Sequence, residues 1–329
     1  MSNTGTMKNP FIISVVAGLL LEAAPCHAQK VFHICALVGE DQFVPAFEGF
    51  RGKMAELGYV EGKNVRYSLY NAKGDMDGLK MLAQKIVQQK PDLIVTSSTT
   101  ATAPVAKLTA GTDLPVVFLT AGNPLKLVKS YSSSGNNLTG ISSSALELTE
   151  KRLALVREFA PMVKRIVFLT NGKATNFEEY LAATRDTASK FNFDMTEIEL
   201  LGANRDEVKK HIGRITRKAG EAVVVPPDAS LVGSIEFISA QAVKERLPSI
   251  GPNVQTVRRG MLAAYSSDYY SLGRQGAKLV DMILRGAKPA DLPIELPQKL
   301  QLAVNLKIAR AIGLKPAKEI LLRADELIE

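Results

Sequence analysis

The chain has 329 residues, of which 46% are hydrophobic and 22% charged. This is the composition of a globular protein, and the length exceeds that of one ordinary domain. The net charge is +8, but Lys and Arg are scattered along predicted helices. The densest group, between Lys209 and Lys218, has helical spacing opposite an apolar face, and no known DNA-binding motif surrounds it. Trp is absent, so we expect no nucleic-acid partner.

The N-terminal segment, residues 1–28, is predicted to be a signal peptide. Lys8 supplies its positive charge, and the apolar run Phe11–Leu21 is much shorter than the ~20 residues that span a bilayer. Ala28 provides a cleavage point, so the mature chain would begin at Gln29. The alternative is a lipoprotein acylated at Cys26. Under the first interpretation the mature protein is soluble and periplasmic.

The first half of the chain alternates short apolar strands with amphipathic helices. One helix opens at Pro45, a second carries the apolar stripe Leu79–Val87, and a third begins near Ala101. The strands are predicted at Val31–Val38, Val65–Tyr70, Asp92–Thr96 and Pro115–Leu119. This order predicts a parallel, doubly wound sheet. Ligands of such sheets bind beyond the carboxyl ends of the strands.

After the polar turn Ser132–Asn137 and the extended segment Thr139–Ser144, where we expect the first crossing between lobes, the alternation restarts. Strands are predicted at Arg165–Leu169, Met195–Leu200, Ala222–Val225, Pro248–Ile250, Met261–Ala264 and Leu300–Val304. Helices are predicted at Glu147–Phe159, Asn176–Lys190, Arg205–Lys218, Leu231–Ala242 and Tyr269–Arg285. The second half therefore predicts another α/β lobe of similar plan.

Four hydroxyl residues, Ser97 to Thr100, join the third strand to its helix. The first turn of a helix has backbone N–H groups without partners inside the helix, and together with the helix dipole they favour an anionic group. No basic residue lies in this turn, so neutral donors would hold the anion. The alternative is that these residues only cap the helix.

Neutral polar residues recur at other strand ends, which suits a small polar ligand held by hydrogen bonds. Ser97, Ser98 and Thr99 are predicted to receive a carboxylate, with Thr120 and Asn123 on the same wall. Asn171, Asp228 and Asp268 are candidates for an ammonium group, and Tyr265 or Phe43 for an apolar wall. Each of these residues could instead be only a cap or turn residue.

Catalytic and cofactor motifs are missing. The sequence has no phosphate-binding P-loop, no dinucleotide-binding glycine motif and no nucleophile elbow. His33 and His211 have no metal-ligand spacing to Cys, Asp or Glu, and Cys35 lies in an apolar strand. We therefore expect no cofactor, no metal site and no catalysis.

Several segments resemble the ABC-transporter substrate-binding proteins of the tryptophan/phenylalanine-binding type. They are Phe47-x-x-Phe50-Arg51, Glu56–Val65, Leu138-Thr139-Gly140, Lys151-Arg152-Leu153, Gly286–Pro293, Asn305-Leu306-Lys307 and Leu322–Glu329. The resemblance runs from about Val31 to the C-terminus. At Gly122-Asn123-Pro124, beside Lys126, the chain departs from the Gly-Asp-Pro common in relatives. That changes the charge of a cleft loop and leaves the ligand open.

The resemblance implies the type I periplasmic-binding-protein plan, in which two doubly wound lobes joined by a multi-segment hinge clamp a ligand. We expect one lobe to comprise residues 29–143 and about 265–288, and the other 144–264 and about 289–329. The implied function is delivery of a small polar or zwitterionic solute, with an amino acid as first guess, to an ABC permease and its ATPase. The binding protein itself is expected to be a monomer. The alternatives are a ligand sensor for a membrane receptor or kinase, and an α/β hydrolase or racemase.

Overall fold

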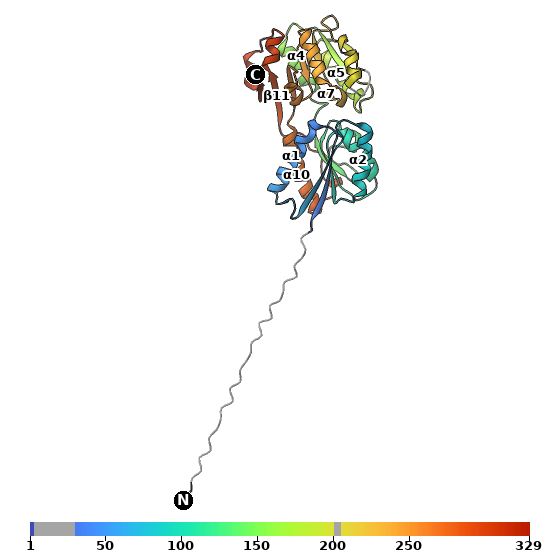
Figure 1. Ribbon diagram of the computed structural model, residues 1–329, viewed down its shortest axis with the longest axis vertical. Helices are drawn as coiled ribbons and strands as arrows, with labels where there is room; N and C mark the ends of the chain where they lie inside the picture. The colour runs from blue at the N-terminus through green and yellow to red at the C-terminus, as the bar shows by residue number, and fades with distance from the viewer. Residues whose placement is uncertain (3–29, 201–204) are drawn as a thin grey trace. The chain divides into compact units, whose positions relative to one another are not determined.

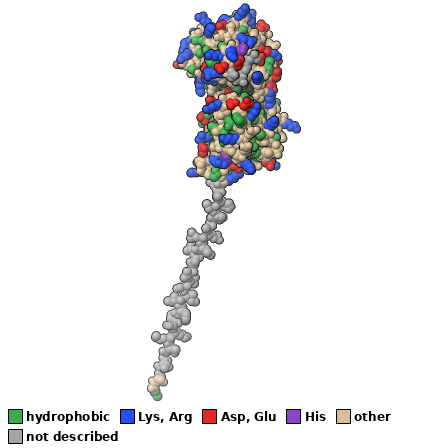
Figure 2. Space-filling view, turned by 45° about the vertical axis from the view of Figure 1, so that its right-hand side comes forward, with side chains coloured by type: hydrophobic (Ala, Val, Ile, Leu, Met, Phe, Trp, Pro, Cys, Tyr) green, Lys and Arg blue, Asp and Glu red, His purple; other side chains and the backbone are tan. Residues whose placement is uncertain are grey.

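The structure, a computed structural model, describes residues 1–2, 30–200 and 205–329. The predicted cleavage point, Cys26 and all but the first two residues of the predicted signal peptide lie outside the described residues. Within the described ranges, no helix is long and apolar enough to cross a membrane. Lys and Arg are interspersed with Asp and Glu on the face in Figure 2, which fits the scatter of basic residues in the sequence.

The first sheet has the strand order β2-β1-β3-β4-β5, and all of its strand pairs are parallel. The strands are β1 Phe32–Val38, β2 Val65–Asn71, β3 Leu93–Thr96, β4 Val116–Ala121 and β5 Leu138–Ser142. The helices are α1 Val44–Glu56, α2 Met76–Gln88, α3 Ser98–Thr109 and α10 Tyr269–Leu284, and the short 3-10 turns are Asp41–Phe43 and Pro124–Lys126.

Helices cover both faces of this sheet because successive side chains of a strand point to opposite faces. Ile34 and Ala36 pack with Phe50 of α1 and Leu272 of α10. On the other face, Leu37 belongs to the cluster that contains the apolar side chains of α2 and α3. Both faces are therefore buried, as expected for a doubly wound sheet.

The second sheet has the order β12-β11-β10-β9-β8-β6-β7 in the part of the chain that the structure describes. Its strands are β6 Arg165–Thr170, β7 Asp194–Glu199, β8 Ala222–Val224, β9 Ser249–Gly251, β10 Ala263–Ser267, β11 Leu300–Asn305 and β12 Glu326–Ile328. Its helices are α4 Thr149–Phe159, α5 Phe177–Lys190, α6 Arg205–His211, α7 Ala229–Gly233, α8 Ile235–Lys244, α9 Val254–Arg258, α11 Leu306–Ala311 and α12 Lys318–Arg323, with 3-10 turns at Ile212–Arg214 and Pro289–Asp291. The pairing of β10 with β11 is antiparallel, and the other pairs are parallel.

Three stretches of chain connect the two sheets (Figure 1). One follows β5, one joins β10 to α10, and one runs from α10 to β11. The last of these lies along the first sheet as far as Glu295, which forms a bridge with Ile141 of β5. The β10 strand remains in the second sheet up to Ser267. The chain thus passes from the second sheet to the first near residue 267 and returns to the second sheet after residue 295. The lobe limits predicted from the sequence are about 265 and 288.

Several predicted elements differ from the structure in their bounds. The α3 helix begins at Ser98, three residues before the predicted start. The predicted helix Arg205–Lys218 stops as α6 at His211 and continues only as a 3-10 turn around Gly213, a poor helix former. The stripe from Leu231 is divided at Ser234 into α7 and α8. The short elements α9, α11, α12 and β12 were not predicted, because so few residues carry no periodic signal.

Glycine permits the close packing of α1 on α10. A Cβ on Gly273 would lie 1.7 Å from the carbonyl oxygen of Ala46, and a Cβ on Gly49 would lie 2.0 Å from that of Tyr270. Both obstacles are backbone atoms, which cannot rotate away. The two helices are therefore in contact through their backbones.

We predict that Gly273→Ala destabilises the protein by about 1–3 kcal/mol, because the helices must separate to admit the methyl group. The matched control is Gly213→Ala, where a Cβ meets nothing within 4 Å, and its effect should stay within about 0.5 kcal/mol. Urea unfolding of the two variants measures the difference. Equal midpoints would contradict this view of the α1–α10 contact.

Candidate functional site

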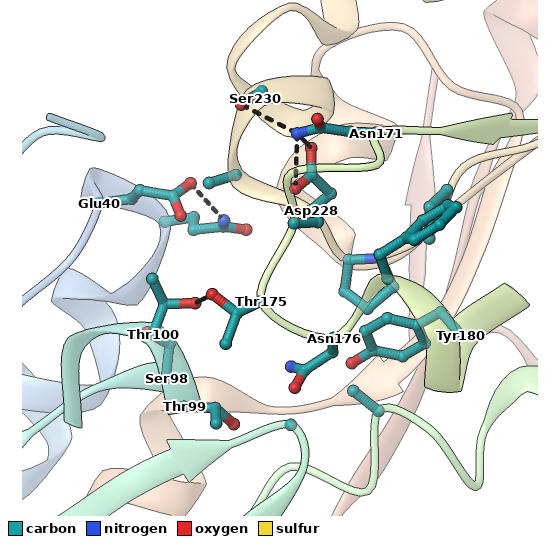
Figure 3. Close-up of a pocket in the computed structure, with 18 of the residues that line it drawn as sticks. Glu40, Ser98, Thr99, Thr100, Asn171, Thr175, Asn176, Tyr180, Asp228 and Ser230 are labelled. Atoms are coloured by element: carbon teal, nitrogen blue, oxygen red, sulfur yellow. Dashed lines mark hydrogen bonds between the residues drawn. The ribbon is translucent and has the colours of Figure 1, made fainter. Parts of the chain in front are cut away.

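A cavity lies at the carboxyl ends of strands from both sheets (Figure 3). The residues after β1, β3 and β4 line it from the first lobe, and those after β6 and β8 line it from the second. Its volume is about 120 Å³, comparable to the ~150 Å³ engineered cavity that admits benzene. It can therefore enclose a ring-sized group.

The turn into α3 forms one wall of the cavity. Ser98 has a φ of 62°, a left-handed conformation that is uncommon for residues other than Gly and that costs of order 1 kcal/mol or more. Its amide donates to Thr120 Oγ1 at 2.9 Å, and its Oγ accepts from the amide of Ala101 at 3.2 Å. Those bonds use the first and fourth amides of the helix. The amides of Thr99 and Thr100 occupy the two positions between them, where a helix offers no internal partner.

Two carboxylates from different lobes point into the cavity (Figure 3). Asp228 is buried and caps α7, where its Oδ1 accepts from the amide of Leu231 at 2.9 Å, and Asn171 Nδ2 donates to both its oxygens at 3.3 and 3.4 Å. Glu40 accepts from Gln42 Nε2 at 2.7 Å. Burial raises the pKa of Asp228 against the effect of these bonds.

Burial also raises the pKa of the Glu40 carboxyl, to about 7. The hydrogen bond from Gln42 opposes this rise, as does the charge of Arg259. The carboxylates of Asp228 and Asp41 add to it. The Glu40 carboxyl is thus costly to ionise while the cavity is closed.

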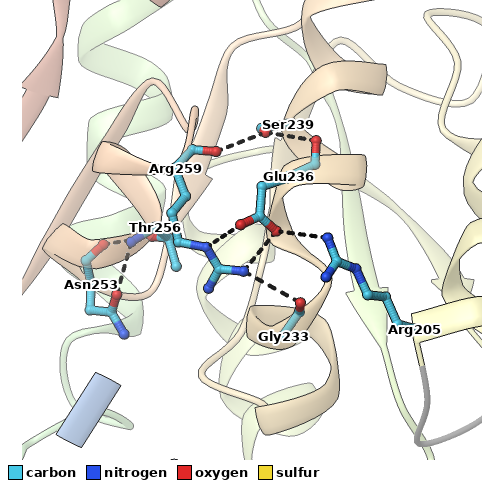
Figure 4. A network of polar contacts seen from close by, with 7 residues as sticks. All are labelled: Arg205, Gly233, Glu236, Ser239, Asn253, Thr256 and Arg259. Atoms are coloured by element: carbon cyan, nitrogen blue, oxygen red, sulfur yellow. Dashed lines mark hydrogen bonds and ion pairs between the residues drawn. The ribbon is translucent and has the colours of Figure 1, made fainter. Parts of the chain in front are cut away.

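A polar network holds the helices beside Asp228 in place (Figure 4). Arg259 makes two 2.7 Å bonds to the carboxylate of Glu236 on α8, and it donates to the carbonyl oxygen of Gly233, the last residue of α7, at 3.3 Å. Arg205 lies 3.9 Å from the same Glu236 carboxylate. The network fixes α7, and with it the cap residue Asp228.

The remaining wall of the cavity is aromatic. Phe43 and Tyr269 pack with ring centroids 5.2 Å apart, and Phe168, Phe177 and Tyr180 line the side formed by the second lobe. Rings in such a wall favour the flat apolar body of a ligand.

Direct contacts join the lobes around the cavity. Thr100 Oγ1 donates to Thr175 Oγ1 at 3.1 Å, and Asn253 Nδ2 donates to Gln42 Oε1 at 2.6 Å. Lys126 Nζ donates to the carbonyl oxygen of Thr175 at 2.5 Å and forms a 2.7 Å ion pair with Glu179. We call these the interlobe contacts. They show that the lobes are closed on one another in this structure.

The cavity brings together most of the residues proposed from the sequence. Those that line it are Phe43, Ser98, Thr99, Thr120, Asn171 and Asp228. The side chain of Ser97 turns away and accepts from the amide of Gly39 at 3.2 Å. Asn123 does not line the cavity, but its amide donates to Thr99 Oγ1 at 3.0 Å and so helps to orient that side chain.

Tyr265 and Asp268 also lie outside the cavity lining. Tyr265 is within β10, and its ring packs against the hydrophobic core of the second lobe. Asp268 caps α10, accepts from the Ser271 amide at 3.3 Å and pairs with Lys299 at 3.1 Å. Both residues are thus occupied by structural contacts, and this placement gives no support to the ligand roles proposed for them.

Sequence reasoning missed Glu40 and Asn176 as lining residues, and it named Thr100 only as a member of the hydroxyl turn. Glu40 lies in the loop after β1, which the strand order had already placed at the correct edge of the sheet, so its position was available. Asn176 precedes α5, and its Oδ1 is buried without a hydrogen-bond partner. Among the described residues, no group of His, Cys, Asp and Glu could hold a metal ion.

These features define a two-lobed binding protein that encloses a small molecule between α/β lobes. The sequence matches the family of ABC transporter substrate binding proteins over residues 32–328. The chain belongs to this family, as the resemblance in the sequence predicted. Two doubly wound lobes on the type I periplasmic-binding-protein plan are likewise confirmed.

Known proteins that resemble the chain include binding proteins for amino acids. A tyrosine-binding protein of Clostridioides difficile (strain R20291) is 28% identical over 289 residues, which are 87% of this chain and 82% of that protein. An ABC domain from Streptococcus pneumonia in complex with L-Trp has a TM-score of 0.82 at 24% identity, covering 91% of this chain and all of that one. The ligand-free, open structure of a substrate-binding protein from Clostridium difficile has a TM-score of 0.68 at 25% identity, covering 91% and 99%.

We predict that acid favours closure of the ligand-free protein. Glu40 in an open, hydrated cleft has an ordinary pKa of about 4.3, whereas in the closed cavity the pKa is about 7. The closed state therefore binds the extra proton between these values and is stabilised as the pH falls through 7, by up to about 3 kcal/mol. Small-angle scattering should give a smaller radius of gyration at pH 5 than at pH 8. Glu40→Gln should reduce the difference and leave the contribution of Asp228, whose pKa is also raised by burial. A wild-type radius that does not change with pH would refute the prediction.

We predict that Lys126→Met loosens the closed state through the interlobe contacts. The Lys126–Glu179 pair is partly exposed, with 37% and 31% of the side chains accessible, so the loss should be at most about 1 kcal/mol, or about fivefold in the closed population. Energy transfer between dyes on the two lobes reports that population. Lys80→Met is the control, because Lys80 pairs at 3.2 Å with Asp77 within one helix. Equal behaviour of the two variants would show that the ion pair does not act between the lobes.

Proposed function

We propose that this chain is the exported solute-binding component of an ABC importer and that its ligand is an α-amino acid with an aromatic side chain. The observation that carries the proposal is a single cavity that combines a neutral anion-binding turn, buried carboxylates and an aromatic wall. An α-amino acid carries the three matching groups within a few ångströms of one another. The tyrosine and L-Trp ligands of two proteins like this chain support the same ligand class.

The ligand carboxylate would lie at the start of α3. The amides of Thr99 and Thr100 face a negative group with the positive end of the helix dipole behind them. The side-chain amide of Asn176 supplies a further polar group, since its Oδ1 is buried without a partner. An Asn side chain can rotate by 180° to present its NH₂ group instead. Lys173 lines the mouth of the cavity, where it is exposed.

The ligand ammonium group would contact Asp228, whose oxygens already have defined directions through Leu231 and Asn171. The ligand side chain would then lie against the aromatic wall, where the rings of Phe43 and Tyr269 pack at a tilt of 32°. Closure of the lobes over the bound ligand would present one defined conformation to a permease and its ATPase. Under this proposal the protein acts in the periplasm as a monomer, and it releases its ligand unaltered.

We predict that L-tyrosine, L-phenylalanine or L-tryptophan raises the Tm of protein that has been unfolded and refolded to remove any co-purified ligand. Ligand at a hundredfold excess over Kd should stabilise the fold by about 2.7 kcal/mol. Asp228→Asn should weaken binding by about 2–5 kcal/mol, at least about 30-fold, because the ammonium group loses its charged partner.

The control for this experiment is Asp186→Asn on α5, which removes an exposed carboxylate that pairs with Lys190 one helical turn away. Its affinity for ligand should equal that of the wild type. Calorimetry of both variants gives the comparison. The proposed function would be refuted if neither the aromatic amino acids nor a broad set of other amino acids raised the Tm.

A further inference from the structure

The two carboxylates of the cavity belong to different lobes. Glu40 follows β1 of the first sheet and has an extended backbone, with φ −154° and ψ 158°. Asp228 follows β8 of the second sheet and has φ −111° and ψ 135°. Both side chains point into the same space (Figure 3), and the charge of Asp228 raises the pKa of Glu40. Closure of the lobes therefore brings two like charges together.

Neither carboxylate has a cationic partner at ion-pair distance in the described part of the chain. Arg259 lies near enough to influence Glu40, but its guanidinium is committed to Glu236 by two 2.7 Å bonds. Lys173 is exposed at the mouth. Two enclosed acids without a counter-charge are costly, and the cost is relieved either by a proton on Glu40 or by a positively charged group on a bound ligand.

The two acids differ in how well they are satisfied. Asp228 accepts from the Leu231 amide and from Asn171. Glu40 accepts only from Gln42 among the hydrogen bonds of its side chain in the described structure. A carboxylate has about four acceptor positions, so Glu40 retains more capacity for a new donor than Asp228 does.

Glu40 is also tied to closure. Gln42 donates to Glu40, and the same Gln42 side chain accepts from Asn253 of the second lobe at 2.6 Å. The direction of the Glu40 carboxylate is therefore set by a contact that crosses between the lobes. An ammonium group, with three donors and one positive charge, suits the space between Glu40 and Asp228.

We infer that Glu40 is a specificity-determining residue: it shares one ligand ammonium group with Asp228, so that a free amine is required for the two lobes to close. This inference rests on the proposed function and adds to it the reason for amine selection. A ligand with the same ring and carboxylate but without the amine leaves two facing carboxylates unneutralised, and it adds a third negative charge. An N-acylated ligand has the same defect and also a larger head group.

The test compares an aromatic amino acid with its deaminated analogue. Calorimetry at pH 8 measures L-tyrosine against 3-(4-hydroxyphenyl)propionate, and L-tryptophan against indole-3-propionate, on wild type and Glu40→Gln. Wild type should prefer the amino acid by at least a hundredfold. Glu40→Gln should lose at least tenfold in affinity for the amino acid and lose little or nothing for the analogue. The ratio of the affinity for the amino acid to that for its deaminated analogue should thus be at least tenfold smaller in Glu40→Gln than in wild type.

Asp186→Asn is the control, since Asp186 on α5 is an exposed acid that pairs with Lys190 and does not line the cavity. It should keep the wild-type preference. Glu40→Ala serves as a second variant should Glu40→Gln fold poorly. An unchanged preference in the Glu40 variants, with normal binding by wild type, would overturn the inference and leave the proposed function standing. If wild type binds neither the amino acids nor the analogues, the proposed function fails and the inference fails with it.

Discussion

The enclosure of two like charges between movable lobes is the constraint on which the site depends. In water the carboxylates of Glu40 and Asp228 would interact weakly, whereas a closed cavity with low polarity strengthens their repulsion several-fold. The protein supplies Asp228 with two donor residues and Glu40 with one. In the described part of the chain, Glu40 thus has fewer hydrogen-bond donors than Asp228, and it has no cation at ion-pair distance. A cation of the right size would bind the closed state more tightly than the open state, and this difference in affinity shifts the equilibrium towards closure.

The topology explains why these groups meet. The parallel strands of each sheet end at the same edge, so loops far apart in the sequence converge there. The turn after β3 contributes Ser98 with its strained backbone, and the turn after β8 contributes the cap of α7. The N-termini of α3 and α7 lie at these edges, and rings from both lobes line the cavity between them. The Arg259–Glu236 network then keeps α7 from yielding when the lobes close.

The strand and helix order could be predicted from apolar periodicity, and the position of the cavity followed from it. Ser98, Thr120 and Asn171 were placed correctly because the strand-end rule needs only the order of elements. The rule failed for Tyr265, because β10 continues to Ser267 through its pairing with β11. A sequence cannot show that pairing.

Glu40 escaped notice for a different reason. An acid in a loop is usually hydrated, and the burial that makes Glu40 unusual comes from its position inside the closed cavity, beside Asp228 of the other lobe. Asn176 is similar, because its orphaned Oδ1 becomes visible only when the loop before α5 is placed against the cavity. The position of a site can thus be predicted from the sequence more readily than the polar groups that become buried without a partner when the lobes close.

The backbone contact between α1 and α10 bears on how the lobes can move. The α10 helix leaves the second sheet after β10, yet Gly273 seats it against Ala46 so tightly that it must travel with the first lobe. Within the connection from β10 to α10, bending is then confined to the few residues around Ser267 and Asp268, where the amide of Asp268 also donates to the carbonyl oxygen of Lys299 on the connection from α10 to β11 at 3.3 Å. The short link between these two of the three connections leaves little chain that can flex when Glu40 and Asp228 separate.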